Sequence, residues 1–243
     1  MAHDGVIWMR PEGGSRGPRA SYTRDDVARA GIALADAEGI DAVSMRRIAA
    51  HLGTGTASLY RYVARKDDIL ELMVDAALGE APPVSLTGDW PEDLRTLAYR
   101  IRDTALRHPW LAPLTAARPT LGPHSLAEIE LVLSVFDGFE RPMDEILANV
   151  GTLIAFVRGH ILEELAESDA ARRTGLDRQT WMARQSAYGP VVMNSGRYPR
   201  VTRMWLEADA PHDPDRLERA FALGLDRVLA GIAATIGRDR GSA

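Results

Sequence analysis

Apolar residues recur at helical spacing along most of the chain, and no stretch alternates apolar and polar residues as a half-buried strand would. The first pattern follows Thr23, whose hydroxyl can cap a helix. Val27, Ala30 and Leu34 then fall at positions i, i+3 and i+7, and Gly39 provides a C-terminal stop. The pattern predicts an all-α fold whose first helix ends at Gly39.

Two short helices are expected next, joined by a tight turn. Ser44 can cap a helix over Met45–Leu52, and Gly53 ends that helix. After the turn, a second run over Thr56–Val63 buries Leu59 and leaves mostly polar tips on its other faces. A helix, a glycine-containing turn and a second helix predict a helix-turn-helix.

Prolines divide the remainder of the chain into further helices. Residues 67–81 are expected to form a fourth helix, because Asp67 and Asp68 suit a first helical turn and Pro82-Pro83 prevents continuation. Ser125 and Glu128 have the spacing of a capping box. The helices predicted beyond residue 84 are Trp90–His108, Trp110–Arg118, Leu126–Phe136, Met143–Glu167, Arg178–Tyr188, a short run at 201–206, and Asp213–Ile236, with an irregular stretch around 194–199.

These boundaries predict four regions. They are a three-helix head over residues 22–66 with a connecting helix over 67–81, a larger helical body over 84–237, a tail over 238–243, and an N-terminal arm over 1–21. The arm is rich in glycine, proline and arginine and has no apolar period beyond the short Val-Ile-Trp run, so we predict that it is flexible. A disordered leader and a basic arm that enters a DNA minor groove both fit this composition.

Positive charge gathers on the predicted helix-turn-helix. Residues 44–66 contain Arg46, Arg47, Arg61, Arg65 and Lys66 and no acidic residue, which gives +5. Because the whole chain carries −5, everything else sums to −10. A small cationic element on an acidic protein is typical of a surface that meets DNA phosphates, and the hydroxyls of the second helix can contact base edges or phosphates.

Composition and motifs argue against several other classes of site. The chain has no cysteine, so disulfides and thiolate chemistry are excluded. Nucleophile elbows, Walker loops and dinucleotide fingerprints are missing, and we expect neither enzymatic activity nor a cofactor. His160 and Glu163 share a helix face but lack further metal-ligating companions, so no metal site is predicted. The longest apolar runs, such as Leu131–Val135, are too short to span a bilayer, and we expect a soluble, cytoplasmic protein with no membrane partner.

The segment EGIDAVSMRRIAAHLGTGTASLYRYVARKDDIL, within residues 23–70, resembles the N-terminal domain of the TetR (tetracycline-repressor) family of transcription regulators. The resemblance rests on a glycine-terminated first helix, an S-x-R-x-I-A-x-x-L-G helix, an L-Y-x-Y-V recognition helix and a following lysine. It implies binding of double-stranded operator DNA through Ser44, Arg46, Thr54, Thr56, Ser58, Tyr60, Tyr62 and Lys66, and the local charge adds Arg47 to this set.

The body resembles, more weakly, the ligand-binding domain of the tetracycline-repressor branch. Trp90, the Arg-Pro-Thr run at 118–120, Gly138-Phe139 and residues 159–164 occur in matching order. The histidine that holds a drug-chelated metal in that branch falls at or beside Leu114 here, so a tetracycline–magnesium ligand is not implied. His108, which lies earlier in the chain, is read as a helix-end histidine.

An apolar pocket with few polar groups suits a largely hydrophobic natural product or drug. Most of the ligand-binding positions follow from the same resemblance, and Trp110 is equally consistent with a place in the core. The full set is Leu97, Ile101, Trp110, Leu114, Arg118, Glu130, Leu131, Ser134, Val150, Ile154 and Glu163.

Glycines inside two predicted helices indicate close approach of another backbone. Gly224 and Gly231 interrupt the last helix, where each costs roughly 1 kcal/mol in helix propensity relative to alanine. In the helix from Met143, Gly151, Ala155 and Gly159 recur every four residues. The pattern predicts a homodimer through helices near 143–167 and 213–236, with ordinary packing inside one chain as the alternative.

The leading hypothesis is a ligand-responsive transcription regulator, a repressor that a small molecule releases from its operator. The molecule would favour a body conformation in which the two heads of the dimer no longer fit successive major grooves. Two alternatives stay open. One is an all-α small-molecule-binding protein or hydrolase with a vestigial helix-turn-helix, and the other is a constitutive DNA-binding or activator protein with a structural body.

Overall fold

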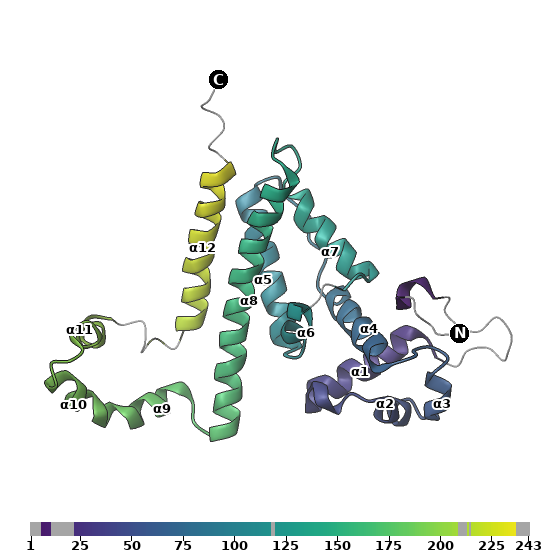
Figure 1. The fold of residues 1–243 in the computed structure, drawn as a ribbon, viewed down its shortest axis with the longest axis horizontal. Helices are drawn as coiled ribbons and strands as arrows, with labels where there is room; N and C mark the ends of the chain where they lie inside the picture. The colour runs from purple at the N-terminus through teal and green to yellow at the C-terminus, as the bar shows by residue number, and fades with distance from the viewer. Residues whose placement is uncertain (1–5, 11–21, 118–119, 209–212, 214, 237–243) are drawn as a thin grey trace. The chain divides into compact units, whose positions relative to one another are not determined.

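The computed structural model describes residues 6–10, 22–117, 120–208, 213 and 215–236, and these contain helices and no strand (Figure 1). The all-α prediction is therefore confirmed. The chain divides into two compact units, Met1–Gly151 and Thr152–Ala243, and each is described by itself.

The first unit contains the elements of the head and the first helices of the body. They are η1 (Ile7–Met9), α1 (Arg24–Glu38), η2 (Ile40–Ala42), α2 (Met45–His51), α3 (Thr56–Leu59), α4 (Lys66–Gly79), α5 (Trp90–Arg107), α6 (Leu111–Ala117) and α7 (Pro123–Ser134). The elements from the boundary onward are α8 (Met143–Thr174), which crosses it, α9 (Arg178–Gln185), η3 (Ser186–Tyr188), α10 (Gly189–Asn194), α11 (Pro199–Glu207) and α12 (Arg216–Ile236).

The helices of the head start and end at the residues that local chemistry favours. Thr23 caps α1 in a reciprocal capping box with Asp26, and Ser44 caps α2 by accepting the backbone N–H of Arg47 at 3.3 Å. Gly53 ends α2 with a φ of 65°, which only glycine adopts readily. The three helices and α4 bury a common core that includes Val27, Ile48, Leu59, Ile69 and Met73.

The described part of the N-terminal arm is packed against the head and α4, so the prediction of a flexible arm is wrong for residues 6–10. Ile7 is fully buried in the core of the head, and its carbonyl accepts a hydrogen bond from Arg24 at 3.0 Å. Arg10 pairs with the buried carboxylate of Asp68 in the first turn of α4 at 2.6 Å. The short apolar run at residues 6–8 has no helical period of its own, but it packs because Ile7 enters the core formed by the helices of the head. The rest of the arm, residues 1–5 and 11–21, lies outside the described residues, as do residues 237–243, which include the predicted tail.

Helix α7 begins earlier than the capping-box pattern predicts. Gly122 is its N-cap and Pro123 its first residue, whereas Ser125 is buried within the first turn. The backbone N–H of Ser125 donates to Asp75 of α4 at 2.9 Å. Asp75 of α4 therefore accepts the Ser125 N–H that Glu128 would accept in the predicted capping box, and Glu128 is released for another contact.

In the second unit, α8 packs against α12. The ring of Phe156 stacks on Phe221 with centroids 5.7 Å apart, and a Cβ added at Gly224 would lie 2.4 Å from the Phe156 ring. Gly224 thus admits a side chain of the same protomer, which is the ordinary packing inside one chain that the sequence analysis keeps as the alternative. Helix α8 continues to Thr174, beyond its predicted end at Glu167. Residues 195–198, between α10 and α11, are not helical, in agreement with the irregular stretch predicted around 194–199.

Helix α8 is long and apolar enough, by length and composition, to cross a membrane, and no other helix of the described residues meets that test. The core helix of a soluble protein meets it as well. Helix α8 buries Leu153, Val157 and Ile161, and 22% of its apolar window is buried inside the single chain.

Candidate nucleic-acid interface and ligand site

The helix-turn-helix exposes a cationic surface, which we define as Arg46, Arg61 and Lys66. All three side chains are exposed, and none of them forms an ion pair within the described residues. Arg46 lies on α2, Arg61 lies two residues after the end of α3, and Lys66 is the first residue of α4. Guanidinium and ammonium groups without an acidic partner suit phosphate oxygens or the acceptor edge of guanine.

Arg47 differs from its neighbour, because its guanidinium is held by Glu38 at the end of α1. Its Nη1 donates to Glu38 at 2.8 Å, and Nη2 contacts the second carboxylate oxygen. The hydrogen bonds from Arg47 lower the pKa of Glu38, and the same contact raises the pKa of Arg47. Arg47 is therefore less available to DNA than the sequence analysis predicts.

The hydroxyl-bearing residues fall into three groups. Tyr60 is 58% exposed, as a DNA contact requires, whereas Tyr62 is 5% exposed and belongs to the hydrophobic core. The expectation that Tyr62 keeps a polar tip at the surface like Tyr60 is not met, because Tyr62 fills the space between the helices of the head. Ser44 uses its hydroxyl to cap α2. Thr54, Thr56 and Ser58 are half-buried around the turn and the start of α3.

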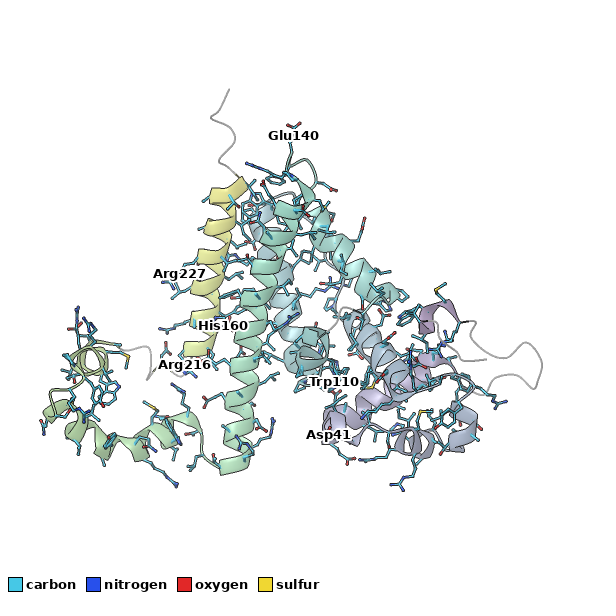
Figure 2. All side chains as sticks on the ribbon, viewed as in Figure 1. Asp41, Trp110, Glu140, His160, Arg216 and Arg227 are labelled. Carbon is cyan, nitrogen blue, oxygen red and sulfur yellow. The ribbon has the colours of Figure 1, made fainter. Side chains whose placement is uncertain are left out.

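The predicted ligand-binding residues of the first unit lie in different surroundings. Trp110 is 5% exposed, and its Nε1 donates to Asp36 of α1 at 2.7 Å, which makes it part of the core that includes the head (Figure 2). Leu114 packs against the same core. Leu97 is fully buried and Glu130 is exposed. Three apolar residues are half-buried, namely Ile101, Leu131 and Val150. The Ser134 hydroxyl donates to the Leu131 carbonyl of its own helix at 2.9 Å. Arg118 lies outside the described residues.

The sequence analysis missed the buried ion pair of the body. Arg100 of α5 and Glu128 of α7 approach to 2.9 Å, with about a sixth of each side chain exposed. Burial raises the pKa of Glu128, and the nearby Arg100 guanidinium acts against that rise. The capping-box spacing of Ser125 and Glu128 concealed this role, and only the pairing of α5 with α7 reveals it.

A groove of about 500 Å³ runs along the face of α5 that carries Arg100. Pro82 and Val84 of the segment after α4 form one wall, and none of the predicted ligand-binding residues lines it. The α5 residues in the groove are Glu92, Arg95, Thr96, Tyr99, Arg100, Asp103, Thr104 and Arg107.

In the second unit, His160 and Glu163 have separate roles. The His160 ring lies 4.7 Å from the Phe156 ring and 5.6 Å from that of Phe221, between α8 and α12 (Figure 2). Glu163 pairs with Arg216 at 3.0 Å. The described residues contain no group of three potential metal ligands. Ile154 is half-buried on the same helix.

Comparison with known proteins covers both parts of the chain. Residues 27–73 match the family described as bacterial regulatory proteins, tetR family, and residues 82–236 match the tetracyclin repressor-like C-terminal domain. The transcriptional repressor DrrR1 of Streptomyces coeruleorubidus is 36% identical over 97% of this chain and 86% of its own. An HTH-type transcriptional regulator of Saccharopolyspora erythraea is 31% identical over 97% of this chain and 94% of its own.

Solved structures give the same result. ActR of Streptomyces coelicolor, a TetR family protein crystallised in complex with actinorhodin, is 27% identical with a TM-score of 0.74, over 90% of this chain and 99% of that one. These matches agree with two features of the structure, the helix-turn-helix that exposes cationic side chains and the all-helical body. The chain belongs to the TetR family and is a helix-turn-helix transcription regulator.

Proposed function

We propose that this protein is a homodimeric repressor that binds operator DNA through its helix-turn-helix and is released by a small, largely apolar molecule. The observation that carries the proposal is the cationic surface of Arg46, Arg61 and Lys66, exposed and without acidic partners among the described residues of an otherwise acidic chain. The repressor name of DrrR1 supports the direction of regulation.

An exposed strip of small residues supports the homodimer. Gly151, Ala155 and Gly159 are exposed along α8, and a Cβ at either glycine would meet no atom within 4 Å. Gly231 of α12 is equally open. Small side chains allow two helices to approach closely, so these faces of α8 and α12 suit a second copy of the chain. A two-fold dimer would present its recognition helices to half-sites about 34 Å apart.

The effector is proposed from the body. ActR was crystallised in complex with actinorhodin, and the body of this chain matches the same family domain. We propose that the effector contacts the predicted positions of the first unit that are apolar and half-buried, which are Ile101, Leu114, Leu131 and Val150. Binding would shift the population of conformations toward one that fits the operator poorly. The protein would act in the cytoplasm, without catalytic turnover.

Selection of binding sites from random duplex DNA tests the function. The protein is expected to enrich a palindromic site and to bind it far more tightly than bulk competitor DNA. Natural products are then screened for release of the protein from the selected operator, with actinorhodin as the first probe. A compound that binds tightly but leaves operator affinity unchanged would refute the coupling, because only differential affinity moves an equilibrium. A stable monomer in solution would refute the dimer.

A further inference from the structure

A buried histidine lies where the body joins the head. His108 is the C-cap residue of α5, directly before the turn into α6, and only 3% of it is exposed. Its carbonyl accepts the backbone N–H of Leu111, the first residue of α6, at 2.8 Å. The residue therefore lies at the joint between two helices of the body.

Both nitrogens of the His108 ring face carboxylates from other helices. Nδ1 lies 3.0 and 3.1 Å from the two carboxylate oxygens of Asp36 in α1, and Nε2 lies 3.1 Å from Glu80, the C-cap residue of α4. Each ring nitrogen therefore lies within hydrogen-bonding distance of a carboxylate oxygen, so one imidazole ring connects acceptors on two different helices.

Trp110 completes the arrangement by donating to the same Asp36 carboxylate at 2.7 Å, and its ring lies 5.5 Å from that of His108. The charged groups that face His108 are thus one carboxylate from α1 and one from the end of α4. Helix α1 belongs to the head, and α4 is the helix that leads from the head into the body. One side chain of the body therefore holds two helices on the DNA-binding side.

We propose that His108, Asp36 and Glu80 form a hydrogen-bonded latch that transmits movement between the α5–α6 joint and the DNA-binding head. Moving the joint without the head would separate the buried His108 ring from both carboxylates, and a buried polar group without a hydrogen-bond partner is unfavourable. The head must follow the joint, or the latch must open. His108 is then a positioning residue, which acts on DNA binding through α1 and α4. The inference rests on the proposed function, because it explains how a body that senses a ligand controls a head that binds DNA.

Hydrogen exchange tests the latch without knowledge of the effector. Backbone amide exchange is measured for the wild-type dimer, alone and with the operator obtained by selection. Saturating operator should slow exchange in α2 and α3, where DNA binds, and also by about tenfold at the α5–α6 joint. In His108→Gln, which is neutral, the head should keep its protection while the change at the joint falls below about twofold.

Two further variants separate transmission from simple damage. Arg107→Gln removes a cation from the neighbouring position, which is exposed, and should behave as wild type. Glu80→Gln removes one arm of the latch at a carboxylate that is 44% exposed, so it is expected to fold even if His108→Gln does not. It should reduce the protection at the joint to a value between those of wild type and His108→Gln.

The outcomes distinguish the two proposals. Failure of the wild-type protein to bind any selected duplex would overturn the proposed function and the latch with it. Protection of the head without a change at the joint would overturn the latch alone. Full wild-type protection at the joint in Glu80→Gln and His108→Gln would likewise show that the three residues do not transmit the movement.

Discussion

The head with α4 buries its large apolar side chains, whereas the segment from α9 to α11 exposes most of its own. In the head with α4, Ile48, Leu59 and Ile69 have no exposed surface, and the N-terminal arm adds Ile7 to the same core. In residues 178–207, only Val192 is buried, while Trp181, Tyr188, Trp205 and Leu206 are exposed by 38% to 72%. Apolar side chains therefore stabilise the folded single chain in the head, where they are removed from water, and contribute little to its stability in the segment from α9 to α11.

The largest expected effect compares the same truncation in the two regions. Leu59→Ala leaves a cavity in the core of the head and should lower the free energy of unfolding by about 2–5 kcal/mol. Leu206→Ala removes the same atoms from a side chain that is 72% exposed, and should change the free energy of unfolding by about 0.5 kcal/mol or less. Urea unfolding followed by circular dichroism measures both. Equal losses would show that α11 is buried in solution.

The next effect concerns the ion pair between the N-terminal arm and α4. Asp68→Asn removes a buried charge that accepts from Arg10 and from two backbone N–H groups, and should cost about 2 kcal/mol at pH 7. Burial by itself would raise the pKa of Asp68, but these hydrogen bonds outweigh it, so the pKa is lowered from 3.8.

The sign of the pH dependence follows from that shift. A carboxylate with a lowered pKa contributes its full stability above pH 3.8, and the contribution is lost as the pH falls through the folded-state pKa. The acid limb of stability against pH should therefore be flatter in Asp68→Asn than in wild type. Asp67→Asn, at the exposed neighbouring position, serves as the control. Identical acid limbs in all three proteins would contradict the pairing with Arg10.

An effect of similar size separates the two faces of α12. Gly224→Ala places a methyl group 2.4 Å from the Phe156 ring and should destabilise the protein by about 1–3 kcal/mol. Gly231→Ala meets no atom of the chain and should raise helix stability by up to about 1 kcal/mol. Thermal unfolding gives the first comparison, and sedimentation across a range of concentrations gives the second. If the open face forms the dimer, Gly231→Ala weakens association, whereas an unchanged dimer would place the interface elsewhere.

The smallest effect divides the cations of the head. Arg46→Ala should weaken binding to the selected operator by about tenfold, because the Arg46 guanidinium is exposed and available to a base or phosphate. Arg47→Ala should weaken it by less, because Glu38 already occupies that guanidinium. Fluorescence anisotropy at fixed salt compares the two, and circular dichroism confirms folding. A larger loss for Arg47 would mean that its pair with Glu38 opens on DNA.

Local chemistry made the head predictable. Thr23, Ser44 and Gly53 define helix ends within a few residues of themselves, and α1 and α2 follow those signals closely. The concentration of positive charge on residues 44–66 is likewise a property of the sequence alone. The candidate ligand residues were less predictable, because helical periodicity identifies an apolar face without saying what covers it.

Contacts between residues far apart in the chain account for what the sequence analysis missed. Ser125 cannot indicate that Asp75 lies 2.9 Å from its backbone, nor can Glu128 indicate that Arg100 approaches it. The sequence by itself determined the helical class, the DNA-binding motif and its charge, since these depend on neighbours within a few turns. Only the tertiary structure decided that Ile7 completes the core and that His108 meets Asp36 and Glu80, because partners 28 and 72 residues away meet only when the helices pack.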